Sequence, residues 1–205
     1  MTRSRVDISS PIMPVPEGLL PVSLSKGVPM KLTKLFGLFF LLIMVTGVFA
    51  REPKTGPVIK DYGPVYDVSG QSWNLDKERH YKVSMDVSAT EESSSNHNRR
   101  IESAARFLNM HARNGIDPKN IDFAIVVHGP AGKDLLKDSA YEDRFLEANP
   151  NTMLLSALHE AGVKIYLCGQ TAAYRGFSAD ELNPAVSLAV SAMTAHVRLQ
   201  SEGYT

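Results

Sequence analysis

The sequence predicts a three-layer α/β/α domain built on a mainly parallel sheet of four to five strands. Between residues 80 and 205, short apolar runs alternate four times with segments of helical periodicity. Such alternation is typical of βαβ units joined by right-handed crossovers. One run, residues 121–128, is apolar almost throughout, which indicates a strand covered on both faces, as in a parallel sheet.

The first part of this domain predicts one strand and one helix before that run. Residues 81–87 alternate apolar and polar side chains, which favours a strand with one covered face. A helix follows, and either Asn96 or Asn98 is its expected N-cap. The expected buried stripe of this helix consists of Ile101, Ala105, Leu108 and Ala112.

The second part predicts the remaining strands and helices. Residues 133–137 favour a short helix, and residues 139–150 are polar enough to form a loop or lid. The other expected elements are a helix at 152–161, a strand at 162–168, a short helix at 172–176, a strand at 185–190 and a helix at 192–202. The side chains expected in the core include Met110, Met153, Met193, Val197 and Leu199.

The N-terminal 50 residues have the pattern of a leader. Two lysines precede an apolar run at residues 35–45, and small residues precede Arg51 as at a cleavage site. We therefore expect a signal peptide at residues 30–50, with residues 1–29 as an over-extended N-terminus. The protein would then be exported to the periplasm, with no membrane contact after cleavage. The alternative is an uncleaved membrane anchor, although the run is shorter than the roughly 20 residues of a span.

Residues 51–79 separate this leader from the domain at residues 80–205. They contain Pro53, Pro57 and Pro64, which predict an extended arm or loop with little regular structure. A short edge strand is expected at residues 65–68.

Composition and motifs argue against several function classes. The chain has 22 Lys and Arg and 22 Asp and Glu, for a net charge of zero, and no basic patch indicates nucleic-acid binding. The histidines lack paired ligand spacing and no CxxC occurs, so no metal site is predicted. Residues 129–133 lack the full spacing of a phosphate-binding loop. No cofactor is implied.

Two chemically reactive side chains come at the ends of predicted strands. His128 ends one strand and Cys168, the single cysteine, ends another. Because parallel strands bring their carboxyl ends to the same edge of a sheet, where ligands bind, the two residues would face one pocket. An unpaired thiol in an exported protein indicates a free reactive group or an intermolecular partner.

The residues after Cys168 are those expected at an anion-binding turn. Gly169 would let the backbone approach a ligand, and the N–H groups of Gln170 and Thr171 would favour a thiolate or bind a persulfide sulfur. Arg175 would add positive charge one turn later, and Gly129 would contribute from the loop after His128. His128 itself is a candidate general base.

Each of these assignments has a structural alternative. Cys168 could be a buried cysteine that only fills space, since free cysteines are among the most buried residues. His128 could simply hydrogen-bond its loop to the sheet.

Three motifs in this order resemble the DsrE/DsrF-like family, in an exported branch. They are the strand end at residues 124–131, the cysteine strand with its turn at 162–172, and the C-terminal helix at 191–204. The resemblance covers roughly residues 80–205. It implies an α/β/α domain, a homo-oligomer and, in the sulfur-relay members, a cysteine matching Cys168 that carries sulfur as a persulfide.

Three hypotheses about function follow. The first is a sulfur carrier or sulfurtransferase-like protein that uses Cys168 and exchanges sulfur with a donor or acceptor protein. The alternative is a non-catalytic module that binds a small ligand or a partner. A third is a structural oligomer in which residues 51–79 clamp neighbouring subunits.

Overall fold

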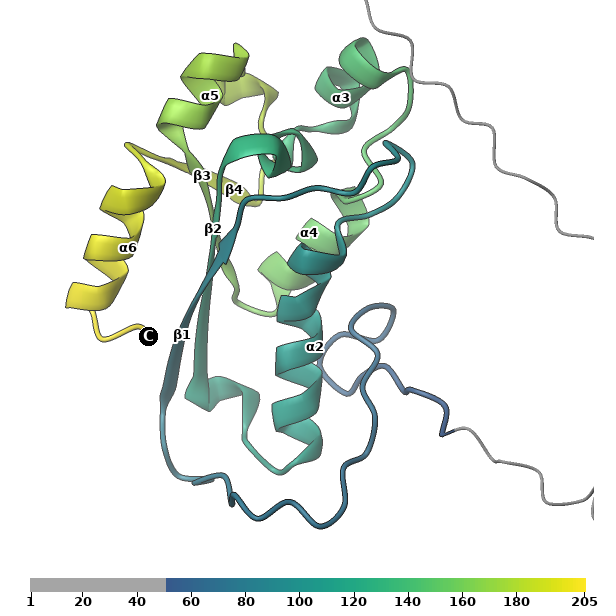
Figure 1. The fold of residues 1–205 in the computed structure, drawn as a ribbon, viewed down its shortest axis with the longest axis vertical. Coiled ribbons are helices and arrows are strands. Elements are labelled where there is room, and N and C mark those ends of the chain that lie inside the picture. Colours follow the sequence, from purple (N-terminus) through teal and green to yellow (C-terminus); the bar gives the residue numbers. More distant parts are fainter. Residues whose placement is uncertain (1–50) are drawn as a thin grey trace, which may run out of the picture. The chain divides into compact units, whose positions relative to one another are not determined.

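A computed structural model describes residues 51–205, which form one compact unit. The expected signal peptide at residues 30–50 and the expected over-extended segment at 1–29 lie outside the described residues. Figure 1 shows a sheet of four strands in the order β1-β2-β3-β4, with every neighbouring pair parallel. The strands are β1 (Tyr81–Val87), β2 (Ile121–Val127), β3 (Lys164–Cys168) and β4 (Val186–Ala189). The parallel α/β prediction is thus confirmed, with four strands.

Besides the strands, residues 51–205 form five α-helices and three 3₁₀ helices. The α-helices are α2 (Arg99–Arg113), α3 (Asp138–Phe145), α4 (Thr152–Glu160), α5 (Gly169–Arg175) and α6 (Ala192–Ser201). The 3₁₀ helices are η1 (Pro118–Asn120), η2 (Gly129–Leu135) and η3 (Ala179–Glu181). No helix within the described residues is long and apolar enough to cross a membrane.

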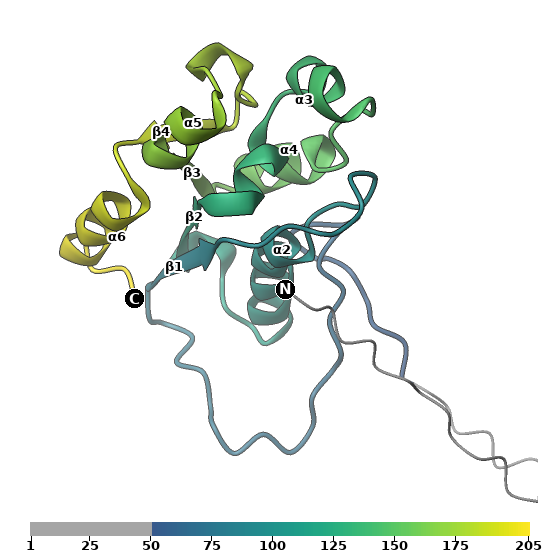
Figure 2. The same cartoon turned by 45° about the horizontal axis from the view of Figure 1, so that its top comes forward.

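Helices cover both faces of the sheet. Helices α2 and α4 lie on one side and α6 on the other (Figures 1 and 2). Strand β2 supplies both cores because its side chains alternate: Phe123 and Ile125 join the larger cluster, and Ala124 and Val126 join the smaller one beneath α6. Its continuous apolarity therefore reflects burial on both faces.

Two helix boundaries follow local sequence signals. Asn98 is the N-cap of α2, and its side-chain oxygen accepts hydrogen bonds from the N–H groups of Arg100 and Ile101. After α2, Gly115 takes a positive φ of 87°, which glycine adopts at low cost. Of the two expected caps, the structure selects Asn98.

Several expected elements differ in the structure. Residues 139–150 are mostly helix α3, and η2 covers the segment that includes the expected short helix at 133–137. Helix α5 begins at Gly169, three residues earlier than expected. No strand forms at residues 65–68, where Val65 makes only an isolated bridge to Lys54. These short segments are shaped by contacts distant in sequence, which local patterns do not contain.

The apolar stripe of α6 does not face the core as expected. Met193 is 78% exposed and Val197 66% exposed, whereas Ala195 and Leu199 are buried against the sheet. Met110 and Met153, also expected in the core, are exposed. The helix packs on the sheet through Ala195 and Leu199, so Met193 and Val197 are left at the surface.

The segment before β1 is bound to its own domain over residues 54–65. Ile59 and Val65 are buried, and the wholly buried Asn109 of α2 holds the backbone of this arm. Its side-chain oxygen accepts from the N–H groups of Val58 and Ile59, and its amide donates to the carbonyls of Ile59, Tyr62 and Gly63. One side chain therefore fixes a loop that has almost no regular structure.

Replacing Asn109 by alanine should release this arm. We expect Asn109→Ala to lower the free energy of unfolding by about 2 kcal/mol, because buried backbone groups lose their partners. Urea denaturation measures this change, and limited proteolysis should show new cleavage within residues 54–65. Met110→Ala, at the next position and partly exposed, is the control. Equal stability of the two variants would contradict the role of Asn109.

Candidate functional site

A cavity of about 650 Å³ opens at the carboxyl ends of the strands. It lies where α5 and α6 leave the sheet on different sides. Its lining residues are Asp86, His128, Cys168, Gln170, Ser191, Ala192, Met193, His196, Val197 and Gln200. The structure thus brings Cys168 and His128, from neighbouring strands, to the same cavity.

Cys168 is a nearly buried thiol, 6% exposed, at the junction of β3 and α5. Burial acts to raise the pKa of this thiol, but polar groups around it outweigh burial and hold the pKa below its ordinary value. The groups that lower it are the N–H and hydroxyl of Thr171 and the N–H groups of Ala192 and Gln170. Cys168 makes no regular capping hydrogen bond, so these donors stabilise the thiolate as nearby dipoles.

Thr171 links the two strand ends that the sequence marks as reactive. The backbone N–H of Gly129 donates to the Thr171 hydroxyl oxygen at 2.9 Å. The hydroxyl accepts this bond through a lone pair and can still donate its own proton to the thiolate, which helps to lower the pKa of Cys168. Gly129 has a positive φ of 58°, so glycine suits this position. Gly129 therefore helps to hold the Thr171 hydroxyl in place, and that hydroxyl helps to lower the pKa of Cys168.

Gly169 is required by packing rather than by ligand approach. A Cβ at this position would lie 2.5 Å from the carbonyl oxygen of Ala189 at the end of β4. The chain then turns at Ser191, whose hydroxyl caps α6 by accepting from the Thr194 N–H. This close contact brings the first residue of α6, Ala192, to Cys168.

A carboxylate bridges two histidines in the same cavity. Asp86 of β1 accepts from His128 Nε2 through Oδ2 and from His196 Nε2 through Oδ1, each at 3.0 Å. With Nε2 of each ring donating, the other nitrogen, Nδ1, is an acceptor. In His196 this nitrogen is used by the Ser84 hydroxyl at 3.1 Å, which leaves His128 Nδ1 as the ring nitrogen available for proton transfer.

The bridging carboxylate is held in its charged form. Burial acts to raise the pKa of Asp86, but hydrogen bonds from His196 and His128 outweigh it, so the pKa lies below the ordinary value. The side chain of Asp86 is 49% exposed and that of His128 35%. The cluster therefore faces solvent and is open to a substrate.

Sequence analysis missed Asp86 and His196. A signal for the first exists, since Ser84 and Asp86 alternate with the apolar side chains of β1 and so share the opposite face. Nothing in the sequence shows that the last helix lies over this face and brings His196 to it.

The remaining predicted site residues differ in their placement. Gln170 lines the cavity and its amide donates to the Val190 carbonyl at 3.4 Å. Arg175 is the exposed last residue of α5 and is not among the lining residues. Among residues 51–205, no group of three or more His, Cys, Asp or Glu side chains is arranged to hold a metal ion.

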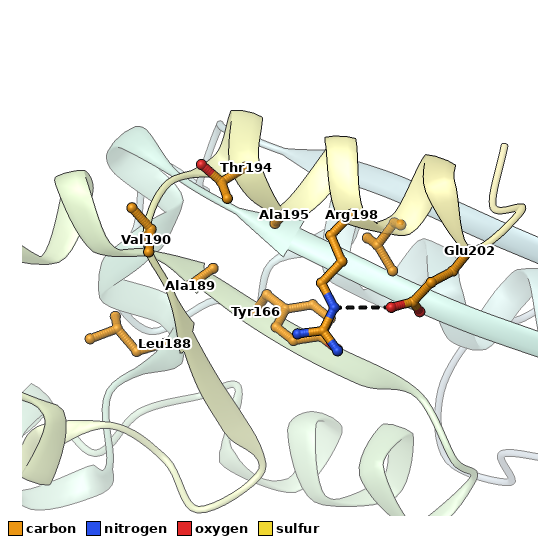
Figure 3. A pocket seen from close by; sticks show the side chains of 9 residues that line it. Tyr166, Leu188, Ala189, Val190, Thr194, Ala195, Arg198 and Glu202 are labelled. Atoms are coloured by element: carbon orange, nitrogen blue, oxygen red, sulfur yellow. Dashed lines mark hydrogen bonds and ion pairs between the residues drawn. The ribbon is translucent and has the colours of Figure 1, made fainter.

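A second hollow lies on the other side of α6 and lacks a nucleophile. It measures about 240 Å³ and lies between α6 and strands β3 and β4. Figure 3 shows Arg198 paired with Glu202, the Nε-to-Oε1 distance being 2.9 Å. This hollow is the more enclosed of the two, but no cysteine or histidine of residues 51–205 lines it. We therefore take the Cys168 cavity as the candidate site.

Comparison with known proteins gives one family. The model of the DsrE/DsrF-like family matches residues 82–205, and no curated protein matches the chain.

Two solved structures are similar to the chain. A protein of unknown function from Methanobacterium thermoautotrophicum, MTH1491, has 19% identity and a TM-score of 0.44, with 61% of this chain and 96% of that one covered. The ychN protein of E. coli has 15% identity and a TM-score of 0.44, with coverage of 59% and 92%.

The thiol should titrate below an ordinary cysteine. We expect the rate of alkylation by uncharged iodoacetamide to reach half its maximum below pH of about 8.5, the value for a free thiol, because nearby donors stabilise the thiolate. Thr171→Val should move this midpoint upwards, and Thr171→Ser, which keeps the hydroxyl, should restore it. A wild-type midpoint at or above that of free cysteine would contradict this account of Cys168.

Proposed function

The chain belongs to the DsrE/DsrF-like family, and we propose that it carries sulfane sulfur as a persulfide on Cys168. The observation that carries this proposal is a single thiol of lowered pKa, opening into a cavity that also holds a histidine–carboxylate pair. A thiolate is the form of cysteine that attacks sulfur. The protein would act as a sulfur carrier or sulfurtransferase-like protein with a donor and an acceptor.

The proposed step transfers one sulfur atom without net oxidation. His128 Nδ1 takes the thiol proton, and the Cys168 thiolate attacks the terminal sulfur of a donor R–S–SH. The donor S–S bond breaks as the new S–S bond forms, giving Cys168–S–SH and the thiolate R–S⁻. His128 returns its proton to R–S⁻, while Asp86 stabilises the imidazolium between the two transfers.

Delivery is the same reaction with the roles exchanged. An acceptor thiolate attacks the outer sulfur of Cys168–S–SH, and Cys168 leaves as the thiolate. The groups that lower the pKa of Cys168 make it a good leaving group, because they stabilise that anion. The N–H groups of Gln170, Thr171 and Ala192 therefore favour both loading and delivery.

We also propose that the protein is an exported homo-oligomer. The export proposal rests on the two lysines and the apolar run of residues 35–45. The oligomer proposal is supported by the edge strand β4, where Leu188 and, directly after the strand, Val190 are exposed apolar side chains, since such side chains mark interaction sites. The exposed apolar side chains of Met193 and Val197 at the cavity support the alternative function, a binding module without turnover in which Cys168 is part of the wall.

Incubation with a hydropersulfide should add sulfur to Cys168. We expect the intact protein to gain the mass of one sulfur atom, about 32 Da, as a persulfide forms. Mass spectrometry under non-reducing conditions measures the gain, and dithiothreitol should remove it. Cys168→Ser is the control and should gain nothing.

The same reaction tests the histidine–carboxylate pair. Asp86→Asn should load about tenfold or more slowly than wild type, because an amide stabilises the His128 imidazolium poorly. Absence of any added sulfur on the wild type across donors would exclude the carrier and favour the binding module.

A further inference from the structure

Lysine and arginine are absent from the wall of the Cys168 cavity among the described residues. Its only titratable side chains are Asp86, His128, His196 and the thiol itself. Arg175 is exposed at the far end of α5, and Arg198 is paired with Glu202 in the hollow on the other side of α6 (Figure 3). Within residues 51–205, no cationic side chain lines the cavity to hold an anionic donor.

The charge of the site is not positive while Cys168 is in the thiolate form that attacks the donor. With both imidazoles neutral, the thiolate and Asp86 give a charge of −2 (−1 and −1). With both imidazoles protonated the sum is zero (+1 and +1 added to −2). A dianion such as thiosulfate would therefore approach a neutral or negative cavity, where like charges oppose it. The backbone N–H groups beside Cys168 offset only the thiolate's own charge.

Part of the cavity wall is apolar. Ala192, Met193 and Val197 form one side of the cavity, with the amide side chains of Gln170 and Gln200 also in its lining. Met193 and Val197 are 78% and 66% exposed, so contact with an apolar body would remove them from water. Methionine is also flexible and polarisable enough to pack against varied shapes.

From this wall we infer that the sulfur donor is a hydropersulfide with an uncharged, apolar body, and that small sulfur oxyanions are excluded. This inference rests on the proposed carrier function and adds its substrate class. The reaction is that given above: the donor S–S bond breaks, an S–S bond to Cys168 forms, and R–S⁻ takes the proton from His128.

The test compares three donors on the full protein. Benzyl hydropersulfide and cysteine hydropersulfide share the reacting S–S–H group and differ in the polarity of the body, whereas thiosulfate is a small dianion. We expect initial loading rates, followed by intact mass, to be about tenfold higher for the benzyl than for the cysteine donor. Thiosulfate should be slower than both.

A charge placed in the wall should change this order. Val197→Lys is expected to raise loading from thiosulfate and lower loading from the benzyl donor. Tyr174→Lys introduces the same charge at an 88% exposed position on α5 outside the cavity lining, and should leave the order unchanged.

The outcomes separate the donor class from the carrier function. Loading of wild type from thiosulfate as fast as from benzyl hydropersulfide would overturn the donor class while the carrier function stands. If Val197→Lys and Tyr174→Lys showed the same donor preference, the inferred donor class would also be overturned, because the cavity wall would then have no part in selecting the donor. Failure of every donor would exclude the carrier function, and the donor class with it.

Discussion

The candidate site depends on one close contact, that of Gly169 with the backbone at the end of β4. Any side chain at this position would collide with the Ala189 carbonyl oxygen, 2.5 Å from the place of its Cβ. Glycine therefore lets the turn from β4 into α6 lie directly against the first residue of α5. The contact brings the Ala192 N–H to Cys168 and starts α6 on the face of the sheet opposite α2 and α4 (Figure 2). Because α5 and α6 diverge here, the cavity opens over the thiol.

Two negative charges share this cavity and are stabilised by different means. The Cys168 thiolate is stabilised by N–H dipoles and the Thr171 hydroxyl, whereas Asp86 is stabilised by hydrogen bonds from His128 and His196. The thiolate thus does not require an imidazolium as its counter-ion. In the proposed reaction His128 is charged only between the two proton transfers, while Asp86 stabilises its imidazolium. This division suits the proposed role of Cys168 as both nucleophile and leaving group.

Local signals in the sequence were sufficient for the sheet and for part of the site. The continuous apolarity of β2 and the helical spacing of α2 and α4 predict these elements, and the ends of parallel strands place His128 and Cys168 at one edge. The meeting of Asp86 with His196 could not be predicted, because it depends on α6 crossing to the second face. The exposure of Met193 and Val197 has a similar cause: a helical stripe does not reveal which surface will cover it. Gly169 is expected from the sequence to let the backbone approach a ligand, yet it is the first residue of α5, where packing against the end of β4 requires the absence of a side chain.

Sulfur carried on Cys168 is best detected on protein taken from cells. Thiols and persulfides are blocked with an alkylating reagent at lysis, and the peptide that contains Cys168 is analysed by mass spectrometry without reduction. The account predicts a fraction of this peptide with one additional sulfur atom between Cys168 Sγ and the blocking group. The proposal would be contradicted if, even after growth with a sulfane-sulfur donor, the Cys168 peptide were found only with the blocking group directly on its thiol or with the thiol oxidised by oxygen.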